Sequence, residues 1–201
     1  GAYTAGDSGG GVTVYVLDSG IRADHAEFPA GRVIGGYNAV AAWEPPDDCT
    51  GHGTHVAGII GGEHFGVATR ATLVAVKVLD CHNRGYVSRV NRALEWVLDD
   101  VAARNRTPAV VSMSLSTPVS ASLNAAVRAV IAAGVPVVAA AGNYMGDSCA
   151  YSPASEEGAI TVAATSRADG RPRFSNYGGC IDVYGPGQDI LSAWHTGVHA
   201  A

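Results

Sequence analysis

The sequence lacks both a long hydrophobic run and a concentration of charge of either sign. No segment approaches the ~18 consecutive apolar residues of a membrane-spanning helix. The 13 Lys and Arg residues and the 18 Asp and Glu residues give a formal net charge of −5 without long runs, which argues against a surface for nucleic acid or anionic membrane. Repeats and linkers are also missing. We therefore expect one globular domain over residues 1–201, in which 47% hydrophobic residues supply the core.

A leader segment is absent as well. The chain begins with Gly1, and no charged stretch followed by an apolar one stands at its start. We therefore expect a processed or excised piece of a longer product.

No pair of cysteines has the CxxC spacing of a metal or redox motif. The four cysteines, Cys49, Cys81, Cys149 and Cys180, allow three pairings, and none lies beside an obvious activating base. This usage favours structural disulfides in an oxidising compartment and predicts a secreted protein. Four buried free thiols in a cytosolic protein are the alternative.

Apolar runs and helical patterns alternate along the chain. The run at 12–17 is β-branched and nearly continuous, which is typical of a strand buried on both faces of a parallel sheet. Alternation of such strands with helices predicts an α/β fold whose mostly parallel central sheet is flanked by helices. We predict further strands at 33–40, 72–79, 109–115, 135–141, 159–164 and 181–184, and a helix at 54–60.

Two longer helices are predicted from apolar residues spaced three and four apart. Ser88 is a candidate cap of the first helix, whose apolar face carries Val90, Leu94, Val97 and Val101. The second helix stops at Gly134, and its apolar face carries Leu123, Val127, Val130 and Ile131.

The stretch GHGTHVAG, residues 51–58, brings a histidine to the start of the 54–60 helix. The imidazole of His52 has an ordinary pKa near neutrality, so it can accept and return a proton during catalysis. Asp18 follows the 12–17 strand and Asn143 follows the 135–141 strand. Ligands collect at the carboxyl ends of strands in open α/β sheets, which makes these three side chains candidates for one site. The alternatives are that Asp18 caps its turn and that Asn143 is a loop amide.

A second histidine, His55, completes an HxxH pair with His52. Such a pair is a weak zinc signal when no third ligand is near. We expect His55 to be a packed helix residue instead.

Several segments together resemble a known family. VLDSG, GHGTHVAG and AAAGN are similar to the aspartate, histidine and oxyanion-asparagine motifs of the subtilisin-like serine proteases, in the order typical of that family. FGVA, AVKVL, YSPAS and FSNYG resemble the proteinase K and aqualysin branch, and the similarity extends from about Gly10 to Trp194. The resemblance implies a three-layer subtilisin-like fold, incomplete at both ends, and a secreted endopeptidase that hydrolyses peptide bonds with an Asp-His-Ser triad.

The resemblance also implies roles for individual residues. His52 would be the general base and then the general acid, Asp18 would fix its tautomer, and Asn143 would donate its side-chain amide to the tetrahedral oxyanion. An extended peptide would add as a strand beside 114–116, with 140–142 lining the pocket for the residue before the scissile bond. The family usually has Gly where this chain has Ser116, so we expect a narrower cleft. The substrate-binding positions are Ser114, Leu115, Ser116, Ala140, Ala141 and Gly142.

Disulfides and a calcium ion are implied by the same resemblance. The cysteine pairs would be Cys49–Cys81 and Cys149–Cys180. A structural calcium ion would be bound by the carboxylate of Asp182 and the carbonyls of Glu157 and Ala159, because a hard cation prefers oxygen ligands. The alternative is that Asp182 is a solvated strand residue. No cofactor is required for the chemistry itself.

The nucleophile is the missing member of this constellation. The family places it in a GTSxA segment downstream of the part that here reads ILSAW, and no such segment occurs in the 201 residues. The serines at 19, 114, 116 and 192 occupy other family positions. We therefore expect the isolated chain to lack triad-dependent hydrolysis.

Three hypotheses follow from this set of motif residues. The chain is part of an active secreted endopeptidase, a noncatalytic protein that binds peptides in the same cleft, or a structural remnant. The first is favoured, because a serine would complete the set of Asp18, His52 and Asn143. A propeptide or a carboxyl-terminal segment carrying the serine would then be its partner.

Overall fold

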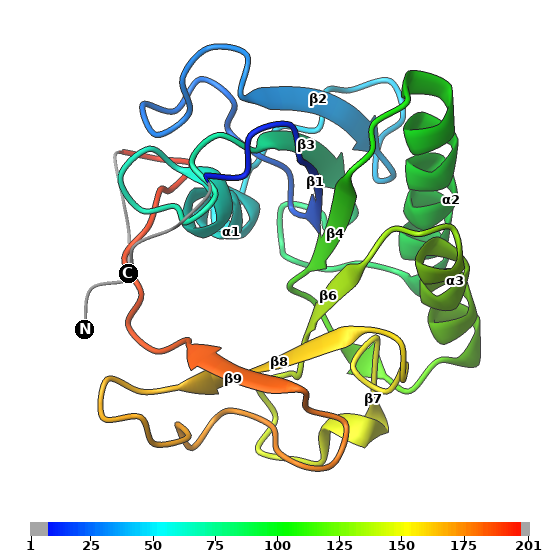
Figure 1. Ribbon diagram of the computed structural model, residues 1–201, viewed down its shortest axis with the longest axis vertical. Coiled ribbons are helices and arrows are strands. Elements are labelled where there is room, and N and C mark those ends of the chain that lie inside the picture. Colours follow the sequence, from blue (N-terminus) through cyan, green and yellow to red (C-terminus); the bar gives the residue numbers. More distant parts are fainter. Residues whose placement is uncertain (1–7, 198–201) are drawn as a thin grey trace.

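The computed structural model describes residues 8–197 and contains a seven-stranded sheet (Figure 1). The strands run in the order β2-β3-β1-β4-β6-β8-β9, and every neighbouring pair is parallel. This confirms the predicted α/β class with a parallel central sheet. The strands are β1 (Thr13–Asp18), β2 (Val33–Asn38), β3 (Thr72–Lys77), β4 (Ala109–Met113), β6 (Val137–Ala140), β8 (Ile160–Thr165) and β9 (Val183–Pro186).

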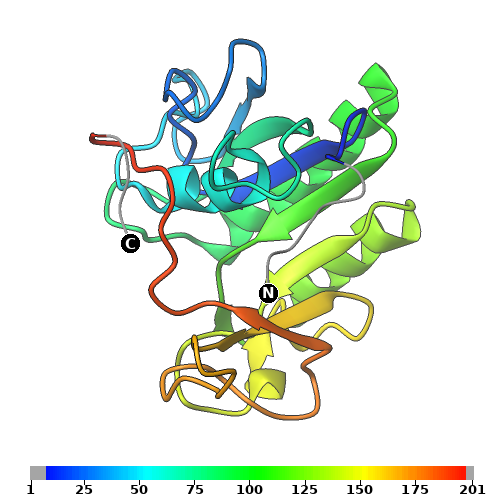
Figure 2. The same ribbon diagram turned by 60° about the vertical axis from the view of Figure 1, so that its left-hand side comes forward.

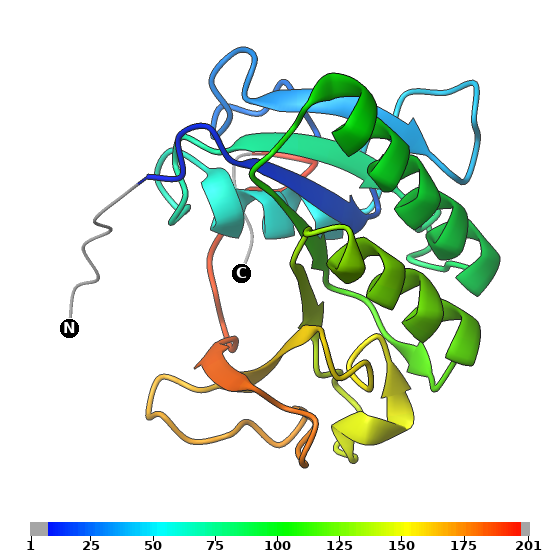
Figure 3. The same cartoon turned by 45° about the vertical axis from the view of Figure 1, so that its right-hand side comes forward.

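Helices cover both faces of the sheet, which makes three layers. Helix α1 (His52–Gly61) lies on one face, and α2 (Val87–Arg104) and α3 (Ala121–Ala132) lie side by side on the other (Figures 1 and 3). Alternate side chains of β1 point to opposite faces of the sheet and pack against the two helical layers. Tyr15 and Leu17 belong to the buried cluster that contains α2 and α3, whereas Val14 and Val16 belong to the cluster with Ala57 of α1.

The predicted element boundaries need a few corrections. Ser88 is not the cap of α2, because the helix begins at Val87, and its N-cap, Tyr86, makes no side-chain cap hydrogen bond. The two-residue strands β5 (Thr117–Pro118) and β7 (Tyr151–Ser152), which pair antiparallel, and the 3₁₀ turn η1 (Ser148–Ala150) were not predicted. They are too short to leave a periodic pattern in the sequence.

The carboxyl ends of the central strands meet at one edge of the sheet. Strand β1 lies between β3 and β4, and β6 follows β4. Asp18 ends β1, Ser114 follows β4 and Asn143 follows β6 by a short connection. Parallel pairing therefore delivers residues that are far apart in sequence to the same edge.

The segment after β9 returns to α1 (Figure 2). The hydroxyl of Ser192 donates to the carbonyl oxygen of His55 at 2.8 Å, and the ring of Trp194 meets that of His55 edge to face, with the ring centroids 6.0 Å apart. No helix within residues 8–197 is both long and apolar enough to cross a membrane.

Candidate active site

The side chains of Asp18 and His52 form a short hydrogen bond at the start of α1. The Nδ1 atom of His52 lies 2.7 Å from Oδ1 of Asp18. The Asp18 side chain is fully buried, whereas the His52 side chain is 42% exposed. An ionised carboxylate only accepts hydrogen bonds, so Nδ1 carries the hydrogen, and in the neutral ring Nε2 is left unprotonated.

Gly53 allows α1 to pack closely against the loop that carries Asp18. A Cβ atom on Gly53 would lie 2.1 Å from the carbonyl oxygen of Gly20 and 3.1 Å from Cβ of Asp18. Any side chain at position 53 would push the helix away from β1. The glycine directly after His52 is therefore needed for the approach of His52 to Asp18.

The surroundings of His52 favour its protonated form. The hydrogen bond to Asp18 raises the pKa of His52, and the charges of Asp18 and Asp48 add to this effect, although partial burial of the ring opposes it. A histidine with a raised pKa is a stronger base once it is neutral.

Asn143 stands on a turn that is braced by the FSNYG segment. The fully buried Asn176 accepts from the backbone N–H of Tyr144 at 2.8 Å and of Gly146 at 3.1 Å, and its Nδ2 donates to the carbonyl oxygen of Ala141 at 2.8 Å. Gly142 has φ +98°, and a Cβ there would lie 2.6 Å from Nδ2 of Asn176. The side chain of Asn143 itself is exposed.

The predicted site residues gather around two adjoining hollows. The larger, of about 600 Å³, and the smaller, of about 390 Å³, both contain His52, Asn143 and Ser114. Leu115 and Ser116 line the larger hollow, Ala141 lines the smaller, and Ala140 and Gly142 line both. Asp18 lies behind His52 and lines neither.

Other lining residues were not identified from the sequence. Tyr86 and Tyr144 are more than half exposed, and the ring of Tyr144 stacks on Tyr151 with centroids 4.6 Å apart. Among the described residues 8–197, no Asp, Glu, Lys or Arg lines the larger hollow. The unpredicted lining residues of that hollow are Leu79, Asn83, Gly85, Tyr86, Val87, Val90, Thr117, Leu123 and Tyr144.

The four serines considered in the sequence have hydrogen-bond partners or positions that differ from those of an activated nucleophile. Ser19 and Ser192 are fully buried, and their hydroxyls donate to Asp48 Oδ1 and to the carbonyl oxygen of His55. Ser114 and Ser116 line the larger hollow, but within residues 8–197 no serine hydroxyl is hydrogen-bonded to His52.

The structure separates the two candidate metal sites, the His52–His55 pair for zinc and Asp182 for calcium. Nε2 of His55 lies 2.9 Å from the carbonyl oxygen of Ile190, so His55 and His52 have different partners and the HxxH pair is not a zinc site. In the described part of the chain, no three His, Cys, Asp or Glu side chains are grouped to hold a metal. Asp182 is exposed, and its Oδ2 accepts from the backbone N–H of Thr161 at 2.7 Å.

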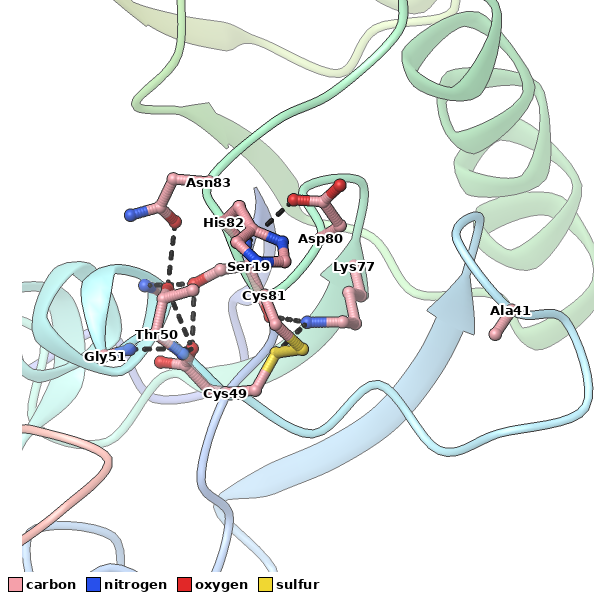
Figure 4. Close-up of a disulfide and its surroundings, with 12 residues drawn as sticks. Ser19, Ala41, Cys49, Thr50, Gly51, Lys77, Asp80, Cys81, His82 and Asn83 are labelled. Atoms are coloured by element: carbon pink, nitrogen blue, oxygen red, sulfur yellow. Dashed lines mark hydrogen bonds between the residues drawn. A yellow bond between two sulfur atoms is a disulfide. The ribbon is translucent and has the colours of Figure 1, made fainter.

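Both disulfides join the cysteines that the family resemblance implied. Cys49 is bonded to Cys81 and Cys149 to Cys180, which confirms the implied pairing and excludes four free thiols. The first disulfide ties the loop before α1 to the loop that contains Asn83, a lining residue of the larger hollow (Figure 4).

The chain is similar to proteases over nearly its full length. A family model described as "Subtilase family" matches residues 9–200. An "Extracellular serine proteinase" of Thermus sp. (strain Rt41A) is 50% identical over 196 residues, which cover 98% of this chain and 47% of that protein. "Subtilisin-like protease 3" of Pseudogymnoascus destructans is 47% identical over 200 residues, which cover 98% of this chain and 49% of that protein.

A solved structure shares the fold. The crystal structure of a cold adapted subtilisin-like serine proteinase matches with a TM-score of 0.93 and 42% sequence identity, and the match covers 99% of this chain and 71% of that one. The chain spans about half the length of the two relatives described above. From the family match and these identities, the chain belongs to the subtilase family.

Proposed function

We propose that this chain supplies the acid–base and oxyanion-binding part of a secreted serine endopeptidase. The observation that carries the proposal is the 2.7 Å contact between His52 Nδ1 and the buried Asp18 carboxylate, at the edge of a cleft that Asn143 also lines. Secretion is supported by the two disulfides and by the relative named an extracellular proteinase.

His52 acts as the proton carrier in this proposal. Its Nε2 takes the proton of an attacking serine and later gives it to the leaving amine. Asp18 holds the ring in the tautomer with hydrogen on Nδ1 and stabilises the imidazolium that forms. The raised pKa of His52 is consistent with this use of the buried carboxylate.

Asn143 stabilises the negative charge that develops on the carbonyl oxygen of the substrate. Its side chain is exposed to the cleft shared with His52, and the Asn176 brace on both flanks of the turn keeps the amide in place before reaction. In subtilisin itself, losing the asparagine donor costs about 2.7–4 kcal/mol of transition-state stabilisation. That magnitude belongs to subtilisin and is carried over by homology.

The substrate is an extended polypeptide whose side chains near the scissile bond are uncharged. The segment 114–116 follows β4 and lies along the larger hollow, where a peptide can pair with it as an added strand. A charged side chain would find no ion-pair partner among the lining residues of that hollow. Ser116 places a hydroxymethyl group at the wall of this hollow.

The nucleophilic serine is provided by a segment beyond these 201 residues. No serine here has the family motif, and Ser19 and Ser192 are buried and bonded elsewhere. The isolated chain should therefore bind peptides but not cleave them. A propeptide would occupy the same cleft by the same strand pairing.

A calcium ion is proposed at the turn before β8. Only one oxygen of the exposed Asp182 carboxylate accepts a hydrogen bond within the described residues, so Oδ1 is available as a ligand. The carbonyls of Glu157 and Ala159 would complete an oxygen-only set, which fits calcium. The ion would stabilise the fold and take no part in the chemistry.

A noncatalytic peptide-binding protein is the second candidate. The cleft along Ser114, Leu115 and Ser116 favours it, because an extended peptide can pair there without any reaction. The two candidates differ in what happens to a bound peptide. If the second candidate is correct, an uncharged peptide would bind in the cleft of the unmodified protein and of its variants and would not be cleaved by any of them.

The experiment that separates the candidates is a peptide cleavage assay on the natural gene product that contains this sequence. We expect cleavage of an uncharged peptide by the unmodified product and its loss in His52→Ala, with peptide affinity retained. His55→Ala is the matched control, because His55 contacts Ile190 and Trp194 rather than Asp18. Binding without cleavage in the unmodified product would select the second candidate.

A further inference from the structure

Asp48 is a carboxylate surrounded by hydrogen-bond donors just before α1. Its Oδ1 accepts from the backbone N–H of Thr50 and of Gly51, each at 2.9 Å. Its Oδ2 accepts from the N–H of Thr54 at 2.9 Å and from the Thr54 hydroxyl at 2.6 Å. Asp48 thus binds backbone groups on both sides of His52, at positions 51 and 54. The start of α1 has no side-chain cap from its own N-cap residue, Gly51, so Asp48 serves that purpose.

Ser19 extends this contact to the other half of the Asp18–His52 pair. Its hydroxyl donates to Oδ1 of Asp48 at 2.9 Å and accepts from the backbone N–H of Gly53 at 2.9 Å. Its own N–H donates to Oδ1 of Asp18 at 2.7 Å, the same oxygen that His52 contacts. One fully buried serine therefore links the loop of Asp18 to the residue after His52.

The charge on Asp48 is stabilised and has a nearby cation. Burial by itself would raise the pKa of Asp48, but the hydrogen bonds from Thr54, Gly51 and Thr50 outweigh burial and lower that pKa. Lys77 is buried, and its Nζ donates to the carbonyl oxygen of Ser19. Burial lowers the pKa of Lys77, while Asp48 and Asp18 oppose that effect. The charged groups near His52 therefore include the buried Asp18 and Lys77 and the half-buried Asp48.

The same loop is anchored on its outer side. Cys49 is bonded to Cys81, and the hydroxyl of Thr50 donates to Oδ1 of Asn83 at 2.9 Å (Figure 4). Nζ of Lys77 lies 3.4 Å from Sγ of Cys49. The disulfide and the Thr50–Asn83 hydrogen bond thus restrain the loop that carries Asp48, and this loop in turn positions the start of α1.

We propose that Asp48 is a positioning residue that, through Ser19 and the first backbone N–H groups of α1, holds the imidazole of His52 against the Asp18 carboxylate. It touches neither substrate nor reacting atoms. Its value to catalysis rests on the proposed function, but the geometry it enforces is a property of this chain alone. Without it, the Asp18–His52 contact, the Ser19–Gly53 hydrogen bond and the bond from the N–H of Arg22 to the Thr54 hydroxyl would still join α1 to the Asp18 loop, but Ser19 and Thr54 would lose the carboxylate to which both donate.

The test uses NMR of the natural gene product that contains this sequence, with three variants. Asp48→Asn removes the charge and leaves one carboxamide oxygen for the six N–H and O–H groups that contact Asp48 as donors. Ser19→Ala removes the hydroxyl that links Asp48 to the N–H of Gly53. Asp100→Asn is the matched control, because Asp100 is a buried carboxylate of α2 that bonds Tyr15, Arg104 and Arg106 instead. The readouts are the low-field Nδ1–H resonance and the titration of His52, hydrogen exchange of the Gly53 amide, and the urea midpoint.

We expect Asp48→Asn to weaken the low-field resonance and to lower the pKa of His52. Ser19→Ala should speed exchange of the Gly53 amide on the order of tenfold, the size of effect that follows from loss of a helix cap. Asp100→Asn should lower the urea midpoint while leaving the His52 titration unchanged. Should Asp48→Asn fail to fold, Ser19→Ala carries the test.

The proposal is overturned if the His52 resonance, its pKa and Gly53 exchange are unchanged in the Asp48 and Ser19 variants. It is equally overturned if Asp100→Asn moves them as much, because the effect would then be one of general stability. None of these readouts needs a nucleophile. A failed cleavage assay therefore leaves this result standing, and a failure here leaves the cleavage result standing.

Discussion

Replacing Asn176 by alanine would remove the brace of the turn that carries Asn143. The side chain is fully buried and makes three hydrogen bonds, to Tyr144 N, Gly146 N and the carbonyl oxygen of Ala141. Each such bond contributes about 1 kcal/mol net, and the groups left without partners add a desolvation cost. We therefore expect Asn176→Ala to lower the free energy of unfolding by about 3–5 kcal/mol.

The assay is urea unfolding of the protein, with Asn124→Ala as the matched control. The Asn124 side chain makes one hydrogen bond, to Oγ of Ser155 at 2.9 Å, and its Oδ1 has no protein partner. Its loss should cost about 1 kcal/mol. If both alanine variants lose the same free energy, the bracing role of Asn176 is refuted.

Three further predictions concern pH, calcium and the cleft. Cleavage by the natural gene product should rise with pH as His52 loses its proton, and the midpoint should lie above the ordinary histidine pKa of 6.5, because the bond to Asp18 raises the pKa of His52. The stability that this bond gives should be complete below pH 6.5 and should be lost as pH rises through the raised pKa. A cleavage midpoint at or below pH 6.5 would contradict the raised pKa. Asp182→Asn should abolish any rise of Tm on adding calcium, and a rise equal to that of the parent would exclude the proposed ligand set. Ser116→Gly should lower KM for peptides with bulky side chains more than for small ones, and an equal change for both would show that Ser116 does not narrow the cleft.

The fold was predictable where the sequence is strongly patterned. The apolar strands end within about two residues of their predicted positions, because burial on both faces requires continuous β-branched runs. The two-residue strands and the start of α2 were not predictable. Pairing of β5 with β7 depends on two loops that meet only in the folded chain, and α2 begins without a capping side chain.

The residues of the candidate site also differ in whether the sequence alone could predict their roles. Asp18, His52 and Asn143 lie in motifs similar to those of the family, so the sequence predicts them as candidate site residues. Asp48 joins its local partners at positions 50, 51 and 54 to Ser19, 29 positions away, and Asn176 contacts Tyr144, 32 positions away. Neither has a local pattern that would reveal its partners, since an aspartate in a polar loop is usually a turn residue. Only the packing of one loop on another shows what these two side chains hold in place.

Labelling with a fluorophosphonate asks directly whether His52 and Asn143 serve an activated serine. The reagent would be applied to the natural gene product and to its His52→Ala variant, followed by mass analysis of the labelled peptides. We predict a single labelled serine, beyond residue 201 and in the same polypeptide as this sequence, and no labelling of the variant. Labelling of a serine within residues 1–201, or equal labelling of the variant, would contradict the proposed roles of Asp18, His52 and Asn143.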